Sequence, residues 1–118
     1  MDLKTGSDLV PTARTAGDSL IMAVRGEIDL HNSPELRTQL FDFLGKYSPK
    51  RLILNLSQVP YMDSSAIAVL VEALRRVRTL GGKICLVDLQ PRVQGLLEIA
   101  RLGTIFTIAK DEAEAMTK

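Results

Sequence analysis

The sequence has few of the residues on which catalytic and metal sites depend. Cys85 is its only cysteine and His31 is its only histidine. A single cysteine cannot form an internal disulfide, so we expect a protein of the reducing cytoplasm. Cys85 lies in the apolar run 84–87, where a free cysteine is expected to be a small buried side chain of a strand.

Motifs of enzymatic chemistry are also absent. There is no P-loop, GxGxxG, CxxC or HExxH, and no GxSxG elbow supplies a serine for His31. The missing phosphate loop argues against a small enzyme or nucleotide-binding domain of flavodoxin-like shape. We therefore expect no enzymatic activity, no cofactor and no metal, with His31 in a loop or at the start of a helix.

One pair of carboxylates lies outside the expected helices. Glu27 and Asp29 follow a predicted strand, with one residue between them. Paired carboxylates can bind a cation or do acid–base work, and they can equally cap the turn after the strand. Two carboxylates alone do not decide between these possibilities.

Long apolar runs and an excess of charge are missing as well. Fifteen basic and fourteen acidic residues leave a net charge of +1, which favours neither nucleic acid nor an anionic membrane as a ligand. No run reaches the roughly 18 apolar residues of a membrane span, and the N-terminus lacks the apolar stretch of a signal peptide. With 46% hydrophobic residues, we expect one domain over residues 1–118 whose partner is a protein or a small ligand.

Hydrophobic periodicity predicts strands that alternate with helices after an opening hairpin. The signals at helix starts and stops include Ser33 as an N-cap, Asp63 as a second cap and Gly81-Gly82 as a stop. The order β-β-α-β-α-β-α-β-α predicts an α/β fold with a mixed sheet. Strands are expected at 8–15, 19–25, 51–55, 83–87 and 105–108, and helices begin near 33, 63, 91 and 111.

The segment 59–66 is the most informative part of the chain. It lies where a buried strand gives way to the longest helix, at the end of an α/β sheet where sites tend to occur. Its serines and aspartate can simply cap the helix. Alternatively, a serine there is a phosphorylation site, because the positive end of the helix tolerates an anion. The local residues leave both possibilities open.

Four segments in the same order resemble the STAS-domain anti-sigma factor antagonists of bacteria. The resemblance covers about residues 8–110 and implies a STAS-type fold, a single layer of helices on a mixed, mainly parallel sheet. The segments are residues 26–29 (Gly-Glu-Ile-Asp), 52–56 (Leu-Ile-Leu-Asn-Leu), 61–65 (Tyr-Met-Asp-Ser-Ser), and a C-terminal group of Gly81-Gly82, the helix from Pro91 and residues 102–106 (Leu-Gly-Thr-Ile-Phe).

The resemblance implies a function by partner switching. The unphosphorylated protein would bind a serine-kinase anti-sigma factor and free a sigma factor. Phosphorylation of Ser64 would block binding, and a phosphatase would reset the protein, which would act as a monomer or weak dimer in the cytoplasm. An alternative is a STAS subunit of a lipid-transporting ABC system that is not phosphorylated. The implied partner-binding residues are Glu27, Asp29, Asp63, Ser64, Ser65 and Ala66.

The chain departs from the family pattern just after these serines. Ala66 and Ala68 stand where the family usually has glycines. Alanine favours a helix by about 1 kcal/mol over glycine, so the helix start should be firmer than in relatives. We also expect the methyl group at Ala66 to crowd a kinase that approaches the backbone closely.

Overall fold

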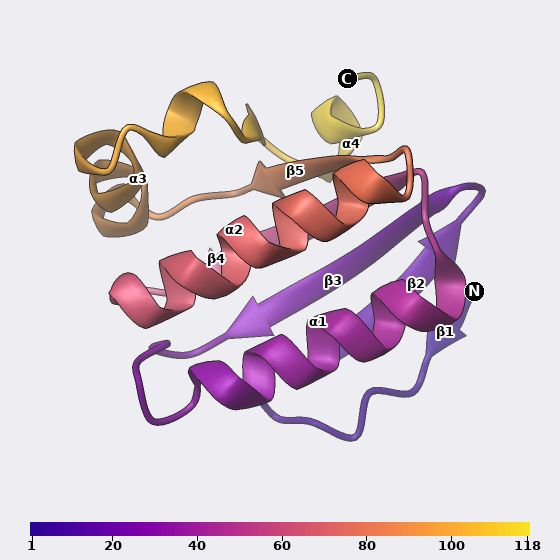
Figure 1. Cartoon of the computed structure of the whole chain (residues 1–118), viewed down its shortest axis with the longest axis horizontal. Coiled ribbons are helices and arrows are strands. Elements are labelled where there is room, and N and C mark those ends of the chain that lie inside the picture. Colours follow the sequence, from indigo (N-terminus) through magenta and orange to yellow (C-terminus); the bar gives the residue numbers. More distant parts are fainter.

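A six-stranded mixed sheet forms the middle of the computed structural model, which covers residues 1–118 (Figure 1). The strands lie in the sheet in chain order, from β1 to β6. Strand β2 pairs antiparallel with both β1 and β3, and β3 to β6 are parallel. Their bounds are β1 Asp2–Leu3, β2 Thr12–Ala16, β3 Ser19–Arg25, β4 Arg51–Gln58, β5 Lys83–Val87 and β6 Thr107–Ala109.

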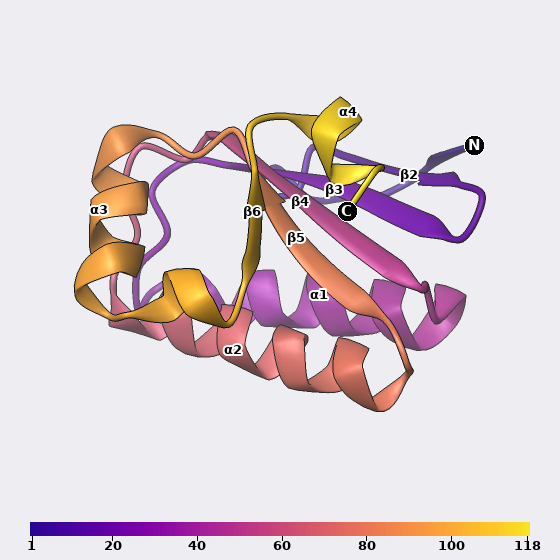
Figure 2. The same cartoon turned by 90° about the horizontal axis from the view of Figure 1, so that it is seen from above.

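The helices cover the sheet unequally, as Figure 2 shows from above. Helices α1 and α2 lie side by side on one face, and α3 stands at the end of the sheet to which β3 and β5 point. The short helix α4 lies on the opposite face. The α/β class and the mainly parallel sheet are confirmed, but α4 is an exception to the expected single layer of helices. The bounds are α1 Ser33–Tyr47, α2 Ser64–Thr79, α3 Pro91–Ile99 and α4 Glu112–Ala115, with a 3-10 turn η1 at Leu102–Thr104.

Each face of the sheet has its own hydrophobic core. A cluster of 27 buried residues fills the space under α1 and α2, and a cluster of six lies on the other side with Ala115 of α4. In β4, Leu52 and Leu54 point into the large core and Ile53 into the small one. A strand covered on both faces has no polar side to show, which explains its continuous apolar run.

Cys85 belongs to the small core, as the sequence predicted. Its side chain is buried, and it is the only free thiol of the chain. Burial raises the pKa of this thiol above its usual value, so the reactive thiolate is disfavoured.

The strands at the two ends of the sheet differ from the prediction. Strand β2 begins only at Thr12, because Pro11 has no N–H to donate to a ladder. The predicted strand 105–108 is shifted to Thr107–Ala109, since η1 occupies the chain just before it. The two-residue strand β1 was not predicted, and its length is too short to show a periodic pattern.

The predicted stop of α2 is confirmed. Gly81 has a φ of +76°, in the left-handed region that favours glycine. The Gly82 amide donates to the Val77 carbonyl at 2.8 Å and closes the last turn. A Cβ on Gly82 would lie 2.8 Å from the Pro49 carbonyl oxygen, so only glycine lets the two chain segments approach this closely. None of the helices has both the length and the hydropathy to cross a membrane.

Candidate functional site

Two loops meet at the carboxyl ends of β3 and β4, on the left of Figure 1 where α2 begins. Because these strands are parallel, loops 26–32 and 59–63 leave the sheet at the same edge. The Ile28 amide donates to the Tyr61 carbonyl at 3.1 Å, and the Asp63 amide donates to the Ile28 carbonyl at 3.0 Å. These bonds extend the parallel ladder by one bridge and fix the first loop against the start of α2.

Asp63 is the N-cap of α2 and also holds the neighbouring loop. Its Oδ1 accepts the amides of Ser65 at 2.9 Å and Ala66 at 3.4 Å, together with the Ser65 hydroxyl. Its Oδ2 accepts the Leu30 amide at 3.0 Å. The Ser65 hydroxyl, with help from these backbone amides, holds the pKa of the carboxyl below its usual value, against the opposing effect of desolvation. Both carboxylate oxygens of Asp63 are therefore engaged within the chain.

The loop before α1 is a closed turn built by two side chains. Asp29 Oδ1 accepts the amides of His31 at 2.9 Å and Asn32 at 3.2 Å. In return, Asn32 Oδ1 accepts the Asp29 amide at 2.8 Å, and Asn32 Nδ2 donates to the Glu27 carbonyl at 2.8 Å. Asp29 thus acts as a turn residue, which is one of the two possibilities for the carboxylate pair. The prediction of Ser33 as N-cap is wrong, because Asn32 takes that position and Ser33 is the first, buried residue of α1.

The two serines at the start of α2 have different surroundings. Ser65 is half-buried, and its hydroxyl donates to Asp63. Ser64 is exposed, and its hydroxyl makes no hydrogen bond within the chain. Of the two hydroxyls, only that of Ser64 is both exposed and free of hydrogen bonds within the chain.

Known proteins of similar sequence place this chain in a family. A family model described as the STAS domain matches residues 10–115. The chain belongs to the STAS domain family. It is 34% identical over 90 residues to the anti-sigma-B factor antagonist of Bacillus subtilis, covering 75% of this chain and 81% of that one. It is also 29% identical over 99 residues to the anti-sigma F factor antagonist of Paenibacillus polymyxa, covering 84% and 85%.

A solved structure supports the same family. The crystal structure of a candidate anti-sigma factor antagonist of Thermotoga maritima superposes on this STAS domain with a TM-score of 0.84. The two chains are 28% identical, and the match covers 93% of each. The fold expected from the resemblance is therefore confirmed.

One residue predicted for the partner surface of this STAS domain is placed elsewhere. Ala66 is fully buried, with its methyl group in the large core under α2. The prediction that this methyl group contacts a partner, or crowds a kinase, is therefore wrong. Ala68 is exposed on the next turn, so the two alanines that replace the family's glycines differ in surroundings.

Two exposed side chains beside Ser64 were not predicted from the sequence. Leu30 is 76% exposed, and Tyr61 is 37% exposed with the Arg92 guanidinium 4.8 Å from its ring centroid. No local pattern marks them, because Leu30 reads as one more apolar residue near a helix start. Only the pairing of the two loops shows that both lie on the same surface as Ser64.

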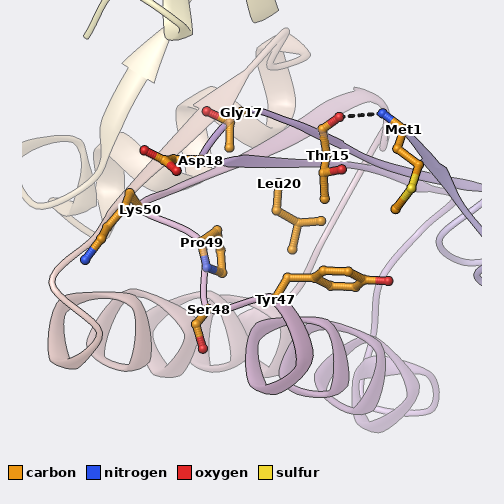
Figure 3. Close-up of a pocket in the computed structure, with 10 residues that line it drawn as sticks. Met1, Thr15, Gly17, Asp18, Leu20, Tyr47, Ser48, Pro49 and Lys50 are labelled. Atoms are coloured by element: carbon orange, nitrogen blue, oxygen red, sulfur yellow. Dashed lines mark hydrogen bonds between the residues drawn. The ribbon is translucent and has the colours of Figure 1, made fainter.

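A cavity of about 290 Å³ lies at the opposite end of the STAS domain (Figure 3). It is lined by the β2–β3 turn and the end of α1, with Leu20 and Tyr47 among its few apolar residues. Lys50 points away from it. None of the predicted site residues borders this cavity, and no group of three or more His, Cys, Asp or Glu side chains is placed to hold a metal ion.

Proposed function

We propose that this chain is an anti-sigma factor antagonist that acts by partner switching. Unmodified, it binds a serine-kinase anti-sigma factor through loop 27–32 and the start of α2, and the sigma factor is released. Phosphorylation of Ser64 by that kinase ends the binding, and a phosphatase restores it. The observation that carries this proposal is the exposed, unbonded hydroxyl of Ser64 beside the engaged hydroxyl of Ser65.

The N-cap explains why a phosphate on Ser64 would stay at the surface. A helix N-terminus offers its first amides to an anion. Here Asp63 already accepts the amides of Ser65 and Ala66. A phosphate of about −1.5 to −2 charges would find these donors occupied and a carboxylate next to it. It would remain solvated, and burying it against a partner would carry a desolvation penalty and repulsion.

The chain's own part in this cycle is limited to a substrate and a surface. Ser64 Oγ attacks the γ-phosphorus of ATP held by the kinase, the bond to ADP breaks, and the serine proton is lost to a base of the kinase. The phosphatase hydrolyses the phosphoserine with water. We infer no enzymatic activity of this chain, and its action in the cytoplasm follows from the proposed partner.

The decisive experiment is phosphorylation by the serine-kinase anti-sigma factors of the source organism. Each purified kinase is incubated with ATP and the wild type, Ser64→Ala or Ser65→Ala, and the products are mapped by mass spectrometry. We expect phosphate on Ser64 in the wild type and in Ser65→Ala, and none in Ser64→Ala. Phosphate on Ser65 alone, or capture of a transport ATPase in place of any anti-sigma factor, would contradict the proposal, and the latter would favour a transporter subunit.

A further inference from the structure

Leu30 contributes nothing visible to the fold. Its side chain is 76% exposed and packs against neither of the two cores. By contrast Ile28, two residues earlier in the same loop, is fully buried. An exposed leucine is common on protein surfaces, so its exposure alone carries no conclusion. The support for a binding role comes from the backbone that holds Leu30 and from the residues around it.

The backbone around Leu30 is fixed from both sides. The Leu30 amide donates to Asp63 Oδ2 at 3.0 Å, which fastens the loop to the N-cap of α2. Asp29 and Asn32 exchange side-chain hydrogen bonds that close the turn containing Leu30. Because the backbone is already ordered, a partner that binds Leu30 loses little loop entropy. An apolar side chain presented on ordered backbone can therefore contribute to binding at a low entropic cost.

Leu30 is also hydrogen-bonded to the residue that precedes the proposed phosphorylation site. Asp63, which holds the Leu30 amide, immediately precedes Ser64 in the chain. Ser64 and Leu30 are both exposed. A kinase that reaches the Ser64 hydroxyl therefore covers the surface that carries Leu30.

The charges on this surface narrow the chemistry of the partner. Both carboxylate oxygens of Asp63 accept backbone amides, one of them from Leu30, and Asp29 Oδ1 accepts amides of its own loop. Glu27 is exposed, and its carboxylate takes part in no hydrogen bond or ion pair of the chain. Besides the Ser64 hydroxyl, the groups on this surface without a partner in the chain thus include the apolar side chain of Leu30 and the carboxylate of Glu27.

We propose that Leu30 is the apolar anchor with which this chain selects its anti-sigma factor. The partner would offer an apolar pocket for Leu30, beside the groove that takes Ser64 and next to a cationic side chain that faces Glu27. This inference rests on the proposed function and names the surface by which one anti-sigma factor would be preferred over another.

The test is the affinity of Leu30 variants for the purified serine-kinase anti-sigma factor that phosphorylates Ser64. Leu30→Asn replaces the anchor by a polar side chain of similar size, Leu30→Ala removes it, and Leu30→Met keeps it apolar. Met116→Gln is the matched control, because Met116 is 39% exposed and directly follows α4, which lies on the face of the sheet opposite α1 and α2. All variants should keep Tm within about 2 °C of the wild type, because no buried contact is lost.

We expect Leu30→Asn and Leu30→Ala to bind at least about tenfold more weakly, mainly through faster dissociation. Leu30→Met should bind within about threefold of the wild type, and Met116→Gln should bind equally well. If both Leu30→Asn and Leu30→Ala bind as tightly as the wild type while phosphorylation of Ser64 still ends binding, the anchor is refuted and the proposed function stands. If the unmodified wild type binds no anti-sigma factor, the proposed function fails and the anchor with it.

Discussion

Asp63 does more at this surface than cap one helix. Its two carboxylate oxygens hold α2 on one side and the Leu30 loop on the other. An uncharged cap could satisfy the helix amides, but it has a single carbonyl oxygen and cannot serve both sides. The negative charge of Asp63 and the order of this surface therefore depend on the same side chain.

The lowered pKa of Asp63 predicts how its contribution to stability depends on pH. A carboxyl whose folded pKa is below the unfolded value stabilises the protein at higher pH, and this contribution is lost as the pH falls through the folded pKa. The unfolded value is about 3.9, so the loss begins below a pH of about 4. We expect Asp63→Asn to unfold at lower urea than the wild type from pH 5 to 8, and the difference to shrink below about pH 4.

Asp42→Asn is the matched control for this measurement. Asp42 is exposed on α1 and forms no hydrogen bond or ion pair in the structure. Its removal should change the free energy of unfolding by less than about 0.5 kcal/mol at any pH. A difference between Asp63→Asn and the wild type that grows on acidification would contradict the assignment.

Substitutions of Ser64 should separate binding from folding. Ser64→Asp places a charge beside Asp63 at an exposed position, so the dipole gain and the repulsion oppose each other. We expect the free energy of unfolding to change by less than about 0.5 kcal/mol. Calorimetric titration against the anti-sigma factor should show at least about tenfold weaker binding.

Ser64→Asn is the neutral control of nearly the same shape. It should bind within about threefold of the wild type if charge, rather than size, ends the binding. Equal weakening by both variants would show that the surface tolerates no larger side chain at Ser64 and would remove the electrostatic explanation.

At the scale of elements, the end of α2 depends on one close approach. Gly82 has backbone carbonyl oxygens of Pro49 and Lys50 at 2.8 and 2.9 Å from where a Cβ would stand. These oxygens belong to the loop that leads into β4, so neither can move without shifting a central strand. The end of α2 and the starts of β4 and β5 are therefore packed closely together at the end of the sheet away from Ser64.

Two glycine-to-alanine substitutions should change the free energy of unfolding in opposite directions. Gly82→Ala should destabilise the protein by about 1–3 kcal/mol, because the methyl group overlaps backbone atoms. Gly45→Ala, at an exposed position in the last turn of α1 with nothing within 4 Å of its Cβ, should stabilise it by up to about 1 kcal/mol. Urea unfolding of both variants is the measurement, and destabilisation of similar size in both would contradict this explanation.

For the whole molecule, the small core depends on a helix of four residues. Two polar contacts hold helix α4 on the sheet. Glu112 forms an ion pair with Arg14 and accepts a hydrogen bond from the side-chain amide of Asn55 at 2.8 Å. Beneath it, Ala115 packs with Cys85 and Ile53. A short helix with few contacts is expected to open more readily than the large core.

The thiol of Cys85 reports this opening. Ala115 is fully buried, so Ala115→Glu should displace α4 and raise the rate of Cys85 modification by a thiol reagent at least about tenfold. Ala113→Glu introduces the same charge at an exposed position of α4 and should leave the rate near that of the wild type. Equal rates in the two variants would mean that α4 does not protect the thiol.

The sequence by itself determined the parts of this protein that depend on neighbours along the chain. Short continuous apolar runs predicted the central strands, and apolar residues at helical spacing predicted the α1 and α2 helices. The local chemistry of Asp63 and Gly81 predicted where α2 begins and ends. Cys85 was predicted to be buried because a short apolar run of this kind has no polar side. These features follow from backbone geometry and side-chain patterns within one element.

The tertiary structure alone decided which of these residues are exposed and which are buried. Ala66 is buried and Leu30 is exposed, although their sequence surroundings gave no sign of either. Asp63 also accepts the Leu30 amide from a loop 33 residues earlier, a contact that no local pattern predicted. The sequence also did not predict on which side of the sheet α4 packs. Exposure and hydrogen bonding depend on segments distant in the sequence, and only folding brings those segments together.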